Sequence, residues 1–492
     1  MLGFHISFIL GFGCGNNRSV LTSTLLYFIT RVGNGILAIA TLAIFTRLLS
    51  PSEYGVYALF IAIATVMSSI FFQWLTAAIG RFYPMYFQDP REIMAVIARW
   101  FWLATTLMAI LYVVIFPLYE IFKIEPALIG ILFMLTLALG RYSIALQIAN
   151  SQSAHIRYCM LSWTKISVAL IAGVLFVYFG IGGQGVLLGF LVGLVLALLI
   201  FEPKPRIGFE FRSSNVNAGI SADMLSYGLP LTLNFLAIVL VDLSDRFMIG
   251  SFLGVSYIAP YAVAYDFVQL TVGPAMNIFA LTAFPVIVHL FDSEKYEEAS
   301  EHLQVLGCKI LSLGLPIIVG LSSMSEDISK YLFGMEYWQD AAMIMPWLAI
   351  AIFIATFKTY FIDVAFQLHH ATKYQGYIAV LMAVINIALN LTLLPSYGVV
   401  AAAWSTLAAF SVGAVVSWII GKQLFSLPSL TDIFWKSIFA SAAMVCALYF
   451  LPPVSGIILL IAKVSCGIFI YSVAAWVLDI ASCRNLLYKL FK

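Results

Sequence analysis

Long, continuous apolar segments alternate with short polar ones along almost the whole chain. Apolar runs of about 18 or more residues are typical of helices that cross a membrane, and their continuous pattern argues against membrane β-strands. We therefore expect an all-α polytopic membrane protein with about fourteen transmembrane helices. The predicted spans are 20–46, 54–76, 94–116, 127–150, 159–179, 183–201, 226–250, 256–288, 305–324, 341–366, 374–394, 398–421, 434–451 and 455–478.

The chain divides into two halves that repeat. Residues 202–225 are rich in Pro, Ser and Asn, which is typical of a linker, and they follow the sixth span. At an offset of 204, the connections between the first and second spans of each half share identical residues. These pairs are Leu49 and Leu253, Ser52 and Ser256, Tyr57 and Tyr261, and Ala58 and Ala262. An even number of spans separates the repeats, so both halves have the same orientation, as in many secondary transporters.

This repeat defines the expected organisation. We predict two parallel six-helix repeats around a central cavity, followed by a C-terminal helix pair. The expected parts are an N-terminal segment (1–18), an N-lobe with spans 1–6 (19–201), a cytoplasmic linker (202–225), a C-lobe with spans 7–12 (226–424), and spans 13–14 with a cytoplasmic tail (425–492).

The composition and the placement of charge agree with this topology. The chain is 63% hydrophobic and 10% charged. If both termini are cytoplasmic, seventeen of the 25 lysines and arginines fall on the cytoplasmic side, Lys165 among them, against three on the outer side. Because cytoplasmic loops are enriched in Lys and Arg, we expect a multi-pass membrane protein with both termini in the cytoplasm. None of the six cysteines falls in an outer loop, so no disulfide framework is expected.

Four cations lie well inside the apolar spans, where a charge costs roughly 2.5–3.5 kcal/mol. They are Arg31, Arg141, Arg246 and Lys358. Arg31 and Arg246 lie in the first span of each half, and the other two lie in the fourth span of each half. We predict that these cations line the central cavity and bind an anionic group of the substrate. The alternative for each is a structural ion pair.

Acidic residues in the spans are candidates for coupling to H⁺ or Na⁺. They are Asp242, Asp245, Asp266 and Asp363. Asp242 and Arg246 are four residues apart and share a helix face, so protonation or sodium binding at an aspartate would free the arginine. Lys358 and Asp363 lie roughly 140° apart on an ideal helix, so they are not expected to pair directly.

Four short segments carry a family resemblance. They are Thr46–Tyr57, Gly80–Pro84, Asp245–Arg246 followed by Gly250–Gly254, and Tyr397–Ala403. Their order and spacing over about residues 20–420 resemble the polysaccharide and O-antigen flippase family of the multidrug/oligosaccharidyl-lipid/polysaccharide exporter superfamily. The resemblance implies two six-helix lobes and flipping of an undecaprenyl-pyrophosphate-linked sugar unit by alternating access. Val255 and Ala259 depart from the pattern of the second half.

From this resemblance we predict a transporter and not an enzyme. It would flip an undecaprenyl-linked oligosaccharide from the cytoplasmic to the periplasmic leaflet for O-antigen or exopolysaccharide synthesis. The expected partners are the lipid-linked glycan, the bilayer, and a polysaccharide polymerase or chain-length protein, with no nucleic acid. No P-loop or metal-binding motif occurs, so we expect no cofactor and no metal, and any coupling would use H⁺ or Na⁺.

Two other functions are compatible with the same pattern. An ion-coupled efflux antiporter of the same superfamily would favour buried acids, and the spans hold five cations, including Lys463, against four acids. A membrane-embedded polysaccharide polymerase or ligase would need an external catalytic surface, and the outer loops are short.

Overall fold

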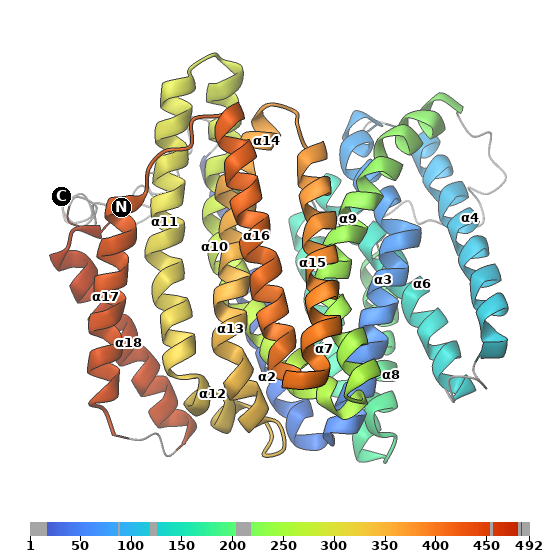
Figure 1. Ribbon diagram of the computed structural model, residues 1–492. Coiled ribbons are helices and arrows are strands. Elements are labelled where there is room, and N and C mark those ends of the chain that lie inside the picture. Colours follow the sequence, from blue (N-terminus) through green and yellow to red (C-terminus); the bar gives the residue numbers. More distant parts are fainter. Residues whose placement is uncertain are drawn as a thin grey trace.

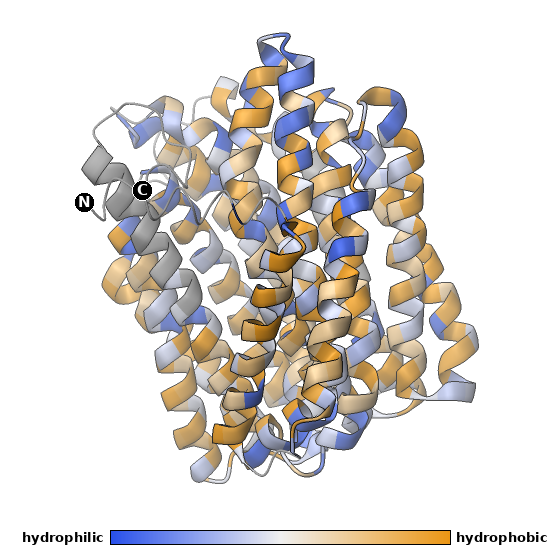
Figure 2. Cartoon of the chain, turned by 90° about the vertical axis from the view of Figure 1, so that its left-hand side faces the viewer, coloured by the Kyte–Doolittle hydropathy of each residue, from blue (hydrophilic) through white to orange (hydrophobic). Residues whose placement is uncertain are grey.

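The structure of the protein is a computed structural model that describes residues 17–86, 89–118, 125–152, 154–202, 218–452, 456–480 and 484. Over these residues the chain is helical and contains no strand (Figure 1). Hydrophobic residues run along the helices, and hydrophilic residues gather mainly at their two ends (Figure 2). This distribution is expected of a bundle whose sides face lipid and whose ends face water.

The long helices follow one another in an up-and-down order. The first half contains α2 (Asn17–Leu48), α3 (Pro51–Phe82), α4 (Arg91–Ile115), α6 (Pro126–Ser151), α7 (His155–Tyr178) and α8 (Gly182–Phe201). The second half contains α9 (Ala218–Phe252), α10 (Ile258–Asp292), α11 (Tyr296–Ser323), α13 (Trp338–Phe357), α15 (Lys373–Tyr397) and α16 (Val399–Leu424). The last pair is α17 (Thr431–Tyr449) and α18 (Ile457–Val477).

Short elements complete the described chain. They are η1 (Tyr83–Tyr86), η2 (Phe116–Leu118), η4 (Val255–Tyr257), α12 (Ser325–Leu332), the π-turn η5 (Lys358–Ile362) and α14 (Val364–Leu368). In the described part of the chain, twelve helices are long and apolar enough to cross a membrane. Together with α2 and α9, of 32 and 35 residues, they match the fourteen predicted spans one for one, and the predicted fold class is confirmed.

The sharp turn between α2 and α3 follows from its local sequence. Ser50 caps α3, because its backbone N–H donates to the Glu53 carboxylate at 3.0 Å while its hydroxyl faces the Glu53 N–H. Pro51 occupies the first helical position, where its missing N–H has no cost. This capping box fixes the turn at the lower face in Figure 1 and sets the entry angle of α3 into the bundle.

The two halves contact each other closely at this lower face. The Tyr337 hydroxyl, before α13, donates a 2.8 Å hydrogen bond to the Leu49 carbonyl oxygen. Arg47 Nη2 donates a 2.6 Å bond to the carbonyl oxygen of Tyr331 in α12. Gly334 lies directly against the Thr46 carbonyl, so that a methyl group there would overlap it. These contacts join the first helix of the N-terminal half to the α12–α13 region of the other half.

The halves also meet along α3 and α9 toward the upper face. A Cβ on Gly228 would lie 2.6 Å from the Trp74 carbonyl oxygen, and the Phe82 and Tyr227 rings pack edge to face at 5.8 Å between centroids. The two halves are therefore in contact toward both faces of the bundle.

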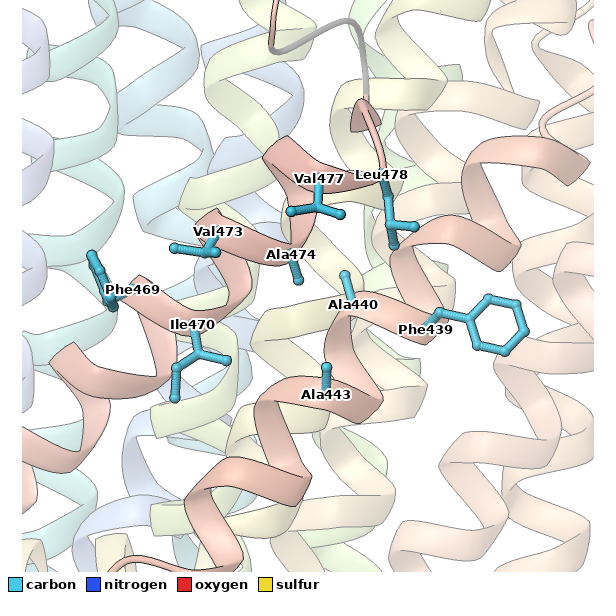
Figure 3. Close-up of a pocket in the computed structure, with 9 residues that line it drawn as sticks. All are labelled: Phe439, Ala440, Ala443, Phe469, Ile470, Val473, Ala474, Val477 and Leu478. Atoms are coloured by element: carbon cyan, nitrogen blue, oxygen red, sulfur yellow. The ribbon is translucent and has the colours of Figure 1, made fainter.

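The C-terminal pair, α17 and α18, packs on the outside of the second half beside α11 (Figure 1). Lys463 Nζ in α18 donates a 2.7 Å bond to Asp327 in α12, so this lysine is paired. Between the two helices lies an apolar groove of about 330 Å³, lined by residues such as Phe439, Phe469 and Ile470 (Figure 3).

The contact at Gly334 gives a test of the closed lower face. Replacing Gly334 with Ala forces the new methyl group into the Thr46 carbonyl, and overpacking of this kind costs about 1–3 kcal/mol. We expect Gly334→Ala to lower the thermal unfolding midpoint of the purified protein. The control is Gly130→Ala in α6, where a methyl group meets nothing within 4 Å. Equal midpoints for both variants would show that the lobes do not meet there as described.

Candidate functional site

A cavity of about 350 Å³ lies between the two halves. Its wall combines residues of α2, α3, α7 and α8 from the first half with residues of α10 from the second half. The polar and aromatic residues in this wall include Thr41, Tyr54, Tyr57, Lys165, Asp266 and Gln269. A site shared by both halves is what the predicted repeat requires of a central cavity.

Arg246 extends from α9 to the edge of this cavity and forms an ion pair with Asp266 of α10. The Arg246 side chain is 6% exposed, whereas Asp266 is 39% exposed and faces the cavity. The sequence analysis expected Arg246 to pair within its own helix, with Asp242. The side chain of Asp242 lies outside the described residues, so that pairing stays a prediction.

Lys165 also lines the cavity, which the sequence analysis missed. It lies in the middle of α7, and its Nζ faces the rings of Tyr142 and Phe190, at 5.0 and 5.9 Å from their centroids. The sequence analysis counted Lys165 with the cytoplasmic cations and did not consider it for the cavity. Its side of the membrane stays a prediction, while the structure places it in the middle of α7 and in the cavity wall.

Asp245, next to Arg246 in α9, faces the opposite way, into the second half. Its carboxylate is fully buried and accepts hydrogen bonds from four residues on three other helices. These are Tyr261 of α10, Asn386 at 3.0 Å and Asn390 at 2.6 Å of α15, and Thr406 at 2.5 Å of α16. The sequence analysis identified Asp245 but not its partners. The available signal was two asparagines, four residues apart, in an otherwise apolar span.

These five residues are hereafter called the Asp245 cluster. In the described arrangement, two amide N–H groups and two hydroxyl groups donate to the carboxylate. The cluster also contains carboxylate, amide and hydroxyl oxygen atoms, the ligand type that suits hard ions such as Na⁺. No lysine or arginine in the described part of the structure pairs with Asp245, and a buried carboxylate needs a proton or a cation to be tolerated. The described residues contain no group of three or more His, Cys, Asp or Glu side chains that would hold a metal ion.

The Asp245 cluster and the cavity are joined through α9 and α10. Asp245 and Arg246 are consecutive in α9, and they contact Tyr261 and Asp266, which lie five residues apart in α10. The ring of Tyr261 stacks on that of Tyr265 at 6.0 Å between centroids, and Tyr265 directly precedes Asp266. A change at the Asp245 carboxylate therefore acts on the same two helices that hold the Arg246–Asp266 pair.

Lys358 and Asp363 form a buried ion pair of 2.7 Å, with side chains 8% and 6% exposed. The prediction that they do not pair is wrong, because the helix is not an ideal α-helix at this point. The π-turn over Lys358–Ile362 closes with a bond from Asp363 N–H to the Lys358 carbonyl oxygen. One extra residue in the turn places residues five apart on the same face. Neither side chain lines the described cavity.

Arg141 of α6 forms an ion pair with Glu202, which follows α8, and its guanidinium lies over the Phe101 ring at 5.4 Å. It does not line the described cavity. The side chain of Arg31 lies outside the described residues, while its backbone belongs to α2 and precedes the cavity residue Ala38 by two helical turns. The substrate-binding roles of the four predicted cations stay predictions.

Comparisons with known proteins agree with this architecture. A family model described as "Polysaccharide biosynthesis protein" matches residues 44–343. A comparison with curated proteins found no significant match.

Solved structures with a similar fold include the lipid II flippase MurJ in an inward closed conformation, with a TM-score of 0.70 and 16% identity over 95% of this chain and 100% of that one. An inward-facing multidrug resistance MATE family transporter of the MOP superfamily gives a TM-score of 0.62 and 15% identity, covering 80% of this chain and 97% of that one. A MATE protein in complex with MaD3S gives a TM-score of 0.55 and 14% identity, covering 80% of this chain and 93% of that one. At these identities the likeness establishes the fold.

The ion pair in the π-turn can be tested by stability. Lys358→Met leaves the Asp363 carboxylate buried without its cation, and breaking a buried pair in this way costs about 3–5 kcal/mol. We expect the double variant Lys358→Met/Asp363→Leu to be much more stable than the single variant, because no charge remains buried. Thermal unfolding midpoints in detergent measure both. A double variant that is less stable than Lys358→Met would contradict the pairing.

Proposed function

The chain belongs to the polysaccharide biosynthesis protein family, and we propose that it flips an undecaprenyl-pyrophosphate-linked oligosaccharide across the bacterial inner membrane. The movement would run from the cytoplasmic to the periplasmic leaflet and supply the synthesis of a cell-surface polysaccharide such as O-antigen or exopolysaccharide. The upper face in Figure 1 would be cytoplasmic, as the distribution of Lys and Arg predicts. A polysaccharide polymerase or chain-length protein would receive the product.

The observation that carries this proposal is the charged cavity shared by both halves. It offers a basic group, an acidic group, an amide group and several aromatic side chains within one cavity. Basic groups suit phosphate oxygens, and the Tyr54 and Tyr57 rings together with Gln269 suit the faces and hydroxyl groups of sugars. Such a mixture fits a polar headgroup better than a purely apolar molecule.

The prenyl tail would stay in the lipid during the movement. A cavity of about 350 Å³ has room for only part of a lipid-linked glycan, and the tail loses nothing by remaining in hydrocarbon. The apolar groove between α17 and α18 (Figure 3) offers a surface along which a tail would pack beside the second half. The pyrophosphate would bind to Arg31 and Arg246, and the sugars would extend toward Tyr54 and Tyr57.

Alternating access would open the lower face. In the described state, the bonds from Tyr337 to Leu49 and from Arg47 to Tyr331 join the halves at that face. To release a sugar there, the halves must separate and break both bonds, while the contact of α3 with α9 holds them together toward the upper face. A ligand that binds the two states with different free energies would shift the equilibrium between them.

Coupling to H⁺ or Na⁺ would occur at the Asp245 cluster. A proton or a sodium ion would neutralise the Asp245 carboxylate. It would also compete with the Tyr261 hydroxyl, which donates a hydrogen bond to that carboxylate. Since Tyr261 lies one turn from Asp266 in α10, repacking of this tyrosine would shift Asp266 relative to Arg246. The ion would in this way change how strongly Arg246 is held by Asp266, and therefore how available it is to a pyrophosphate. Asp242 and Asp363 remain weaker candidates for the same role.

Ion binding at Asp245 has a direct test by thermal stability. A ligand that binds only the folded state raises the unfolding midpoint, so Na⁺ at constant ionic strength, or a lower pH at constant Na⁺, is expected to stabilise the wild-type protein. Asp245→Asn, which carries no charge and keeps the shape, should abolish this response. The control is Asp432→Asn, at an exposed position of α17. A variant Asp245→Asn that responds as the wild type does would place the ion elsewhere.

The cavity cations can be tested in cells. In a host strain that lacks this chain, Arg246→Ala and Arg31→Ala are expected to reduce surface polysaccharide at least about tenfold, because each removes a charge-assisted contact to phosphate. Arg31→Lys should restore part of it. Arg157→Ala, near the start of α7 and outside the cavity lining, serves as the control.

Full surface polysaccharide with both alanine variants would contradict the proposed cation site. Export of an organic cation dye that depends on this chain, with no effect on polysaccharide, would favour an efflux antiporter instead.

A further inference from the structure

Lys165 differs from the other cations that the sequence analysis singled out and the structure describes. Arg141, Arg246, Lys358 and Lys463 each pair with a carboxylate, those of Glu202, Asp266, Asp363 and Asp327 respectively. No described carboxylate lies within ion-pairing distance of Lys165. Its ammonium group instead makes cation–π contacts with the rings of Tyr142 and Phe190.

The surroundings of Lys165 hold its ammonium at the cavity without neutralising it. The Nζ atom lies over the rings of Tyr142 and Phe190, and Phe190 lines the same cavity as Lys165. Attraction to an aromatic face is weaker than the hydration that an ammonium group loses when it is partly buried. The site therefore stabilises Lys165 fully only when a second, anionic partner is present.

The charges at the cavity wall also favour an anionic partner for Lys165. Among the described residues, Lys165 contributes a positive charge and Asp266 a negative charge to the wall. The charge of Asp266 is already compensated by its ion pair with Arg246 of α9. Lys165 belongs to the first half of the chain and Asp266 to the second, and both line the same cavity without forming an ion pair. The described wall thus carries one uncompensated positive charge, located on α7.

We propose that Lys165 is a substrate-contacting residue that binds the anionic group of the transported lipid, and that it determines the preference of the cavity for an anionic over an uncharged headgroup. The inference rests on the proposed function and specifies its binding site. The anion would be an oxyanion, supplied either by the phosphate of the carrier lipid or by the carboxylate of an acidic sugar. An ammonium group accepts both, because it presents three rotatable donors and a compact charge.

Binding of two matched pairs of probes tests this role. The first pair is undecaprenyl pyrophosphate and undecaprenol, and the second is octyl glucuronide and octyl glucoside. Native mass spectrometry of the purified protein measures how much of each member of a pair is retained. The variants are Lys165→Gln, Lys165→Arg and Lys422→Gln, with Lys165→Met as a second neutral variant if Lys165→Gln does not fold.

Lys422→Gln is a closely matched control. Lys422 also lies over an aromatic ring, that of Trp418 at 4.4 Å, but it is exposed at the end of α16 and does not line the cavity. The two glutamine variants therefore both remove a lysine charge and a cation–aromatic contact, and they differ in their position relative to the cavity.

We expect the wild type to retain the anionic probe of at least one pair preferentially, and Lys165→Gln to lower that preference about tenfold. Lys165→Arg and Lys422→Gln should keep it. The pair that responds identifies the source of the anion as phosphate or sugar carboxylate. A wild-type preference that Lys165→Gln retains would overturn the inference and leave the proposed function standing. A wild type with no preference for either anion would contradict the proposed function and the inference together.

Discussion

Two consecutive residues of α9 connect the parts of this molecule that a transporter must couple. Asp245 faces the interior of the second half and Arg246 faces the cavity between the halves, and each contacts α10. Because neither charge can remain bare inside a membrane protein, each must keep a partner in every state. The polar contacts of α9 and α10 are therefore constrained from both sides, by the Asp245 cluster and by the cavity.

The same requirement explains the other buried charges. The ion pairs of Arg141 with Glu202 and of Lys358 with Asp363 do not line the described cavity. The first joins α6 to the end of α8, and the second lies within one π-turn. Lys165 and Asp266 line the cavity, so the cavity is where charge is available to a ligand.

Much of the fold could be predicted from the sequence, because span length and apolar continuity are local properties. All fourteen spans, the family and the capped turn at Ser50 follow from residues close together in the chain. The site was harder to predict, because the residues that contact one another in it are distant in the sequence. The bonds from Asn386, Asn390 and Thr406 to Asp245 join three helices, and no local pattern specifies them. Lys358 and Asp363 were misjudged because an ideal helix does not contain the π-turn. Lys165 was counted with the loop cations, although it lies inside both the predicted span and α7.

The central claim is that this chain moves an undecaprenyl-pyrophosphate-linked glycan between leaflets. The most direct measurement uses the purified protein in liposomes that contain such a lipid, labelled on its sugar, and follows the label that becomes accessible to a membrane-impermeant reagent added outside. The account predicts accessibility of the whole lipid pool at a rate well above that of protein-free liposomes, faster with an imposed gradient of Na⁺ or H⁺. Accessibility that stops at the outer leaflet, as in protein-free liposomes, under every gradient would contradict it.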